Sequence, residues 1–228
     1  MPKRFVDRGP ELYDYLIAAS SRESALKKEL REATAKLPDA RMQITPEQGQ
    51  FMALLAKSIG AKRALEIGLY TGYSAWCVAE AIDEGGNLIA CDASAEWTSI
   101  AREFWEKAGV AEKIDLRIAP ALETLASLEA DGQGGALDYA IIDAEKGKYA
   151  SYYETCLRLL RSGGLIVVDN ALFGEARSWI LSTRTWIRLP SAILMRRLGT
   201  MSGWMPACYR LATAFTWLES VEEPWQKI

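Results

Sequence analysis

Short apolar segments alternate with amphipathic ones along the middle of the chain, and this alternation predicts strands and helices in turn. The apolar segments are hydrophobic at nearly every position, which is typical of parallel strands that helices cover on both faces. Strand–helix alternation with short connections therefore predicts an α/β fold with a doubly wound, mostly parallel sheet. The predicted strands are Arg63–Ile67, Asn87–Cys91, Ile114–Ile118, Leu137–Asp143 and Leu165–Asp169, and the helices between them are Tyr73–Ile82, Ala95–Ala108, Pro120–Ala130 and about Tyr149–Leu160.

Three more helices are predicted before the first strand. Two amphipathic segments lie at about Glu11–Ser20 and Ser24–Leu37. The third helix begins after Thr45, because a threonine cap, a proline at the first helical position and Gln48 three residues after the cap form a helix start signal. This helix is expected to stop at Gly60.

Composition and charge narrow the class of protein. A chain of 228 residues, half of them hydrophobic, suits one well-buried domain. The net charge of −3 and the absence of a basic block give no support for nucleic-acid binding. No apolar run approaches the roughly 20 residues of a membrane span, and the polar first ten residues lack the apolar core of a secretory signal. We therefore expect a cytoplasmic protein that binds neither nucleic acid nor a membrane.

Cysteine and histidine usage limits the chemistry. The four cysteines are widely spaced without a CxxC pair, which argues against a zinc site and a redox motif and fits a reducing cytoplasm. The chain has no histidine, so any general base or metal ligand must come from Asp, Glu, Asn, Lys, Tyr or Cys.

A glycine-containing turn follows the first predicted strand, where doubly wound sheets bind ligands. Gly68 permits a tight turn, and Tyr73 and Ser74 open the helix whose N–H groups point at the ligand. Glu66 is expected to place a carboxylate at the mouth, which favours a cationic ligand over a pyrophosphate. Asp92, 26 positions later, ends the next strand and is placed to accept both hydroxyls of a ribose.

One alternative remains open for this turn, and another is excluded. Tyr70 and Tyr73 occupy the second and third glycine positions of GxGxxG, so an NAD fingerprint is excluded. An ordinary strand–helix turn followed by a helix N-cap is the other interpretation.

Acidic residues also end the last two predicted strands. Asp143 ends one of them, and Asp169 and Asn170 end the next. Because adjacent strands lie about 5 Å apart, three oxygen ligands can converge there and suit Mg²⁺, Mn²⁺ or Ca²⁺. Lys146 is close enough in sequence to Asp143 to take a proton from a metal-bound hydroxyl. Alternatively, both aspartates cap the segments that follow them.

The chain from about Leu12 to Gly174 resembles the cation-dependent O-methyltransferase family, which includes caffeoyl-CoA and catechol O-methyltransferases. The segments that carry the resemblance are KELREATAKL, TPEQGQF, LEIGLYTGYSA, CDASAEW, AGVAEKIDLRIAPALETL, DYAIIDAEKGKYASYYE and GGLIVVDNALFG. It implies a Rossmann-like class I methyltransferase domain over residues 1–174. It also implies S-adenosylmethionine as cofactor, a divalent metal, foremost Mg²⁺, and a catechol-like or caffeoyl-type acceptor that is methylated on one hydroxyl. Relatives are commonly homodimers, so a homodimer is expected.

The resemblance also implies residue roles. Glu66 would bind the amino group of S-adenosylmethionine, Ser74 its carboxylate and Asp92 its ribose. The metal ligands would be Asp143, Asp169 and Asn170, with Lys146 and Asp143 as the catalytic pair. Many relatives read IDADK where this chain has Glu145, which leaves the role of that position open. The cofactor-binding set would be Met42, Ile44, Glu66, Gly68, Leu69, Tyr70, Tyr73, Ser74, Asp92, Ala93, Ala121 and Asp143.

The tail at 175–228 departs from the family, which normally ends with two strands around LPIGDG. Read one base earlier, plausible codons for Met201–Met205 spell DERVD, and the same frame continued through Leu218 can spell ACLLPIGDGVHLAR. We therefore predict a frameshift, with the final strand pair missing or disordered and the tail packed loosely as coil or short helices. The alternative is a truly divergent tail.

The altered tail defines a second function hypothesis, a cofactor-binding protein with impaired catalysis. A methyltransferase acting on nucleic acid or protein is a third, against which the acidic balance and the metal ligands speak.

Overall fold

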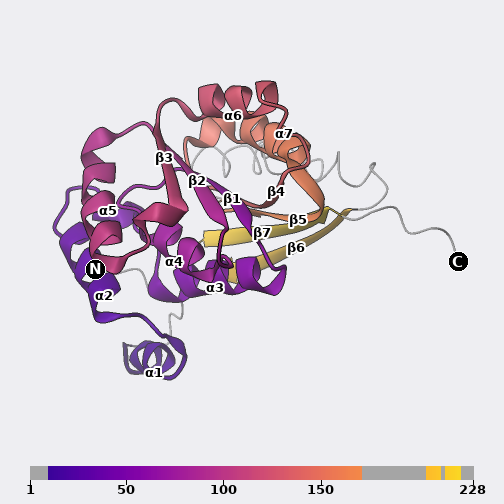
Figure 1. Cartoon of the computed structure of the whole chain (residues 1–228). Helices are drawn as coiled ribbons and strands as arrows, with labels where there is room; N and C mark the ends of the chain where they lie inside the picture. The colour runs from indigo at the N-terminus through magenta and orange to yellow at the C-terminus, as the bar shows by residue number, and fades with distance from the viewer. Residues whose placement is uncertain (1–9, 171–203, 212–213, 222–228) are drawn as a thin grey trace, which may run out of the picture.

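The computed structural model describes residues 10–170, 204–211 and 214–221 (Figure 1). Its sheet has the strand order β3-β2-β1-β4-β5-β7-β6, and the first five of these strands are parallel. Because chain order reverses beside β1, the sheet is doubly wound as predicted. The parallel strands are β1 Arg63–Ile67, β2 Asn87–Asp92, β3 Ile114–Ile118, β4 Leu137–Ile142 and β5 Leu160–Val168.

Helices cover both faces of the sheet, with α3, α4 and α5 on one face and α6 and α7 on the other (Figure 1). Most of their ends lie within two residues of the predicted ones, and α5 agrees at both. None of the helices in the described ranges is long and apolar enough to cross a membrane. The helices are α1 Pro10–Ser20, α2 Ala25–Thr34, α3 Pro46–Ser58, α4 Tyr73–Ala81, α5 Ala95–Ala108, α6 Ala121–Ala130 and α7 Tyr149–Leu159, and the 3₁₀ turns are η1 Ala40–Met42, η2 Ala111–Lys113 and η3 Lys146–Lys148.

The core consists of two apolar layers, one on each side of the sheet. Along β1, Leu65 and Ile67 belong to the layer beneath α6 and α7, whereas Ala64 belongs to the layer beneath α3, α4 and α5. Successive side chains of a strand point to opposite faces, so a strand covered on both faces must be apolar throughout. This explains the uninterrupted apolar runs in the sequence.

The predicted absence of the final strand pair is wrong. Strands β6 (Trp204–Leu211) and β7 (Ala214–Val221) form an antiparallel hairpin, and β7 pairs antiparallel with β5 from Leu165↔Ser220 to Val168↔Trp217. The edge of β5 offers unpaired backbone groups to any segment that can extend beside it. Pro206 is tolerated because β6 is the edge strand, where a missing N–H leaves no partner unpaired.

The rest of the predicted loose tail, at 175–203, 212–213 and 222–228, lies outside the described residues, as do the side chains of β6 and β7. Backbone pairing alone does not reveal the reading frame of the gene. The frameshift therefore stays a prediction, and so does the loose packing of the tail outside β6 and β7.

Candidate functional site

A cleft of about 820 Å³ lies beyond the carboxyl ends of the parallel strands, and we call it the main cleft. Segments that follow β1, β2, β3, β4 and β5 all contribute to its lining, together with η1 and the residues after it. Two predicted site residues, Glu66 and Asp169, are not among the lining residues. Those that line it are Met42, Ile44, Gly68, Leu69, Tyr70, Tyr73, Ser74, Asp92, Ala93, Ala121, Asp143, Lys146 and Asn170.

The turn after β1 requires glycine for both conformation and space. Gly68 has φ +88°, and a Cβ on it would overlap the backbone carbonyl of Asp143 at the end of β4. Gly72 has φ +75°, and a Cβ there would overlap the ring of Trp105 in α5. Tyr70, between these glycines, also has a positive φ, +52°. The turn is thus pressed against the neighbouring strand end and helix.

Asp92 ties the end of β2 to this turn. Its Oδ2 accepts the backbone N–H groups of Leu69 (2.9 Å) and Tyr70 (3.1 Å), and its Oδ1 accepts the N–H of Ser94 (2.8 Å). The sequence predicted a ribose acceptor here, and the structure adds a role in holding the turn. Each carboxylate oxygen has two lone pairs, so further donors can still be accepted.

Glu66 lies beneath the cleft rather than at its mouth, which corrects the sequence-based expectation. It is 1% exposed, its Oε1 accepts the Ser74 hydroxyl, and its Oε2 is buried without a hydrogen-bond partner. Burial raises the pKa of Glu66 to about 8, and the nearby charges of Asp143 and Asp92 act in the same direction. A cationic donor beside Oε2 would relieve this cost.

The carboxyl ends of β4 and β5 bring two aspartates together. Asp143 comes directly after β4, and Asp169 comes directly after the adjacent strand β5. The N–H of Asp169 donates to Ile142 O at 2.9 Å. The Asp169 carboxylate accepts Gln48 Nε2 at 2.8 Å on Oδ2 and the Asn170 N–H at 2.7 Å on Oδ1. Burial and the neighbouring Asp143 raise the pKa of Asp169 to about 7.

This donor set fits a hard divalent cation. Two carboxylates on adjacent strand ends and the side chain of Asn170 provide oxygen ligands of the kind that Mg²⁺ or Ca²⁺ prefers. A dication would also offset the repulsion that raises the Asp169 pKa. Over the part of the chain that the structure describes, no group of three His, Cys, Asp or Glu side chains is arranged to hold a metal, so a cation at these strand ends would also need the amide of Asn170.

Lys146 lies at the same end of the sheet, as its spacing from Asp143 predicted. Its Nζ donates to Asp143 Oδ1 at 2.8 Å and to the Tyr149 hydroxyl at 2.5 Å. The Tyr149 hydroxyl in turn donates to the backbone carbonyl of Asp169 at 3.0 Å. Asp143 thus pairs with a lysine, which disfavours the interpretation of this residue as a simple cap.

Sequence reasoning missed two polar residues of this site. Tyr149 opens α7 and gave no signal beyond its nearness to Lys146. Gln48 matched a helix start motif, and this local explanation hid its contact with Asp169, 121 positions away.

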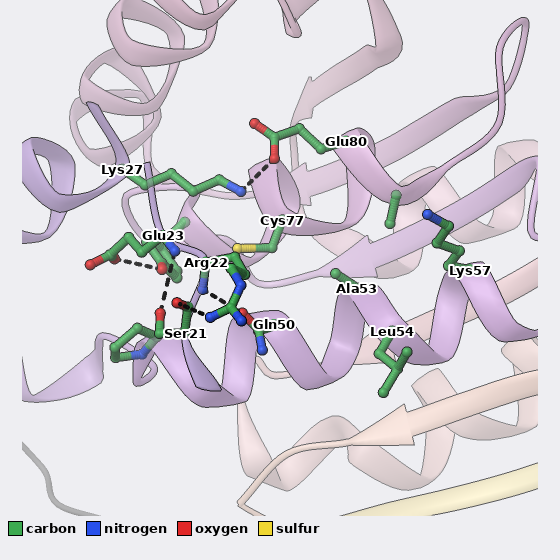
Figure 2. Close-up of a pocket in the computed structure, with 13 residues that line it drawn as sticks. Ser21, Arg22, Glu23, Lys27, Gln50, Ala53, Leu54, Lys57, Cys77 and Glu80 are labelled. Carbon is green, nitrogen blue, oxygen red and sulfur yellow. Dashed lines mark hydrogen bonds and ion pairs between the residues drawn. The ribbon is translucent and has the colours of Figure 1, made fainter. Parts of the chain in front are cut away.

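A second cavity, of about 320 Å³, is lined by residues of α2, α3 and α4 and of the segment that precedes α2 (Figure 2). Figure 2 shows Lys27 and Glu80 pointing toward each other, with Cys77 nearby. Lys27 Nζ and Glu80 Oε2 form an ion pair at 2.6 Å. Glu23 pairs with Arg31 and also accepts the Tyr73 hydroxyl. These paired charges join α2 to α4 and indicate a structural role.

The sheet order, the glycine-containing turn and the acidic end of β2 together define the architecture of class I methyltransferases. A family model described as O-methyltransferase matches residues 17–177, and the chain belongs to this family. The resemblance stated from the sequence motifs is thereby confirmed.

Named relatives and a solved structure agree with this assignment. The chain is 43% identical over 162 residues to catechol O-methyltransferase domain-containing protein 1 from Mus musculus and 44% identical over 169 residues to caffeoyl-CoA O-methyltransferase 2 from Zea mays. These matches cover 71% and 73% of this chain but only 62% and 64% of the relatives, less than two thirds of their length. The SAH-bound Podospora anserina methyltransferase PaMTH1 superposes with a TM-score of 0.73 at 26% identity, over 97% of this chain and 98% of that one.

Proposed function

We propose that this chain is an S-adenosylmethionine-dependent O-methyltransferase that needs a divalent cation and methylates one hydroxyl of a catechol-like or caffeoyl-type small molecule. The observation that carries the proposal is the meeting of Lys146 and Asp143 with the glycine-containing turn in one cleft. Family membership supports the reaction type, and the names of the mouse and maize relatives support the acceptor class.

The cofactor would occupy the part of the cleft beside the turn. Glu66 Oε2, buried and unpartnered, suits the cationic amino group of S-adenosylmethionine. The N-terminus of α4 at Tyr73 and Ser74 suits its carboxylate, because free N–H groups and the helix dipole favour an anion there. Asp92 would hold the ribose. The SAH in the Podospora relative, the demethylated product of this cofactor, supports the same ligand.

The acceptor would lie next to Lys146. Asp143, Asp169 and Asn170 would hold the cation, which supplies Lewis acidity that lowers the pKa of an acceptor hydroxyl. Lys146, held by Asp143 and Tyr149, would then take up the hydroxyl proton or stabilise the phenolate charge. No covalent enzyme intermediate is needed. Enclosure of both reactants in one cleft would lower the reaction barrier by holding them in the reactive orientation.

Replacement of Lys146 tests the proposal. Lys146→Ala should lower kcat for a catechol by about 100-fold or more while leaving S-adenosylmethionine affinity unchanged in calorimetry. The matched control is Lys107→Ala, which removes an exposed lysine that also pairs with a carboxylate, Glu103, and should keep full activity. An unchanged kcat with a raised KM in Lys146→Ala would make Lys146 a binding residue and contradict its catalytic role.

The same assays separate the alternative hypothesis. Tight S-adenosylmethionine binding without turnover of any catechol would support a cofactor-binding protein with impaired catalysis. The homodimer stays a prediction, for which light scattering should give twice the chain mass of 25.3 kDa.

A further inference from the structure

Gln48 lies in the first turn of α3, and its side chain bridges this helix to the end of β5. Its Nε2 donates to Asp169 Oδ2 at 2.8 Å, and the two residues are 4% and 1% exposed. Because an ionised carboxylate can only accept, the NH₂ end of the Gln48 amide must face it. The contact is therefore a buried, directional hydrogen bond to one of the proposed metal ligands.

This contact is not the one that the local sequence favours. Gln48 stands three residues after Thr45, where a glutamine side chain usually turns back to the backbone N–H of the cap residue. In the structure Thr45 Oγ1 accepts the Gln48 backbone N–H at 3.4 Å, but the Gln48 side chain extends to Asp169 instead. The helix start thus fixes the Gln48 backbone, whereas the Gln48 side chain contacts Asp169, the residue directly after β5.

Two donors fix the orientation of the Asp169 carboxylate. One is the backbone N–H of Asn170, which belongs to the adjacent residue and moves with the same segment. The other is Gln48, which is anchored in a separate helix. Gln48 is also neutral, so it satisfies an anionic oxygen without adding a positive charge that would repel a divalent cation.

We propose that Gln48 is a positioning residue that orients Asp169 for a divalent cation. The inference rests on the metal site of the proposed function, and Gln48 acts through Asp169 without contact to the reacting groups. Partners that orient metal ligands typically change metal affinity by about 10–100-fold when they are removed.

The test is Mn²⁺ binding to the full chain, followed by electron paramagnetic resonance. Gln48→Leu should weaken the Mn²⁺ Kd by about tenfold or more, because Asp169 Oδ2 loses its donor. Tyr139→Phe is the matched control. Its hydroxyl donates to Met52 O at 3.2 Å, so this variant also loses a buried hydrogen bond between α3 and the sheet, one helical turn further from the site. The control should keep its Mn²⁺ Kd within about twofold, and calorimetry should show unchanged S-adenosylmethionine affinity in both variants.

A shorter amide keeps the test decisive if Gln48→Leu does not fold. Gln48→Asn retains the chemistry but is one methylene too short to reach Asp169, so it should also weaken Mn²⁺ binding. Wild-type Mn²⁺ affinity in the folded Gln48 variants, or an equal loss in Tyr139→Phe, would overturn the positioning role alone. A wild-type chain that binds no Mn²⁺ would instead overturn the metal site of the proposed function, and the positioning role with it.

Discussion

The backbone of Gly68 lies directly against the backbone carbonyl of Asp143, so that the turn after β1 and the end of β4 touch without a side chain between them. This approach joins the segment proposed to bind the cofactor to the segment that carries Lys146. Any atom added at Gly68 must push the turn and the end of β4 apart. This would disturb both the proposed cofactor site and the segment that carries Lys146.

Gly68→Ala should therefore cost more stability than its backbone conformation alone explains. Gly85 is the matched control, because it also has a positive φ, +78°, but has no atom within 4 Å of an added Cβ. Gly85→Ala should lower the free energy of unfolding by about 1 kcal/mol, and Gly68→Ala by roughly a further 1–3 kcal/mol from overpacking. Urea denaturation measures both, and equal losses in the two variants would contradict the close approach.

S-adenosylmethionine affinity should depend on pH through Glu66. The pKa of Glu66 is raised to about 8, so the carboxyl is mostly protonated at pH 7 and must lose its proton to pair with a cationic ligand. Affinity should accordingly rise between pH 6 and 8, by up to about tenfold per pH unit, and then level off. Calorimetry in buffers with different ionisation enthalpies should detect the released proton at pH 7.

Glu66→Gln is the control for this pH dependence, because it cannot titrate and shows the pH response of the ligand alone. The raised pKa also predicts that wild-type stability falls as pH rises from about 4.5 to about 8, because across this range the folded state keeps a proton that the unfolded state has lost. Identical pH profiles for wild type and Glu66→Gln would rule out Glu66 as the titrating group.

Loss of the Asp92 carboxylate should weaken cofactor binding strongly. Asp92→Ala removes the proposed ribose contacts and also frees the turn at Leu69 and Tyr70, so the S-adenosylmethionine Kd should rise more than tenfold, about 2 kcal/mol. Asp115→Ala removes an exposed aspartate of β3 that pairs with Arg117 and should leave the Kd unchanged. Calorimetry at one pH compares the variants, and wild-type affinity in Asp92→Ala would refute the role of Asp92.

Local patterns predicted the parallel part of the fold well because those patterns are caused by burial. The bounds of β1, α5 and β3 agree with the prediction at both ends. The start of β5 at Leu160 was missed, since it depends on backbone pairing of Leu160 with Leu137, which polar and glycine residues after Leu160 conceal. Strands β6 and β7 were missed because the predicted frameshift argued against regular structure in the tail, whereas in the structure β7 pairs with the edge of β5.

The main cleft was predictable where strand ends define it, and less so where long-range packing does. The lining at Gly68, Asp92 and Asp143 followed from their positions at the ends of predicted strands. The depth of Glu66 did not, because a strand pattern gives the face of a residue but not its distance from solvent. The Gln48 contact was hidden because it joins residues 121 positions apart, and a local sequence pattern does not indicate such a contact.

Cation-dependent formation of a methylated product tests the proposed function most directly. The wild-type chain is treated with EDTA, incubated with S-adenosylmethionine and a catechol with or without restored Mg²⁺, and the products are identified by mass spectrometry. We predict no monomethylated catechol in EDTA, its formation when Mg²⁺ is restored, and cofactor binding that EDTA leaves unchanged. Full product formation in excess EDTA, or no product with Mg²⁺ and bound cofactor, would contradict a cation-dependent catechol methyltransferase.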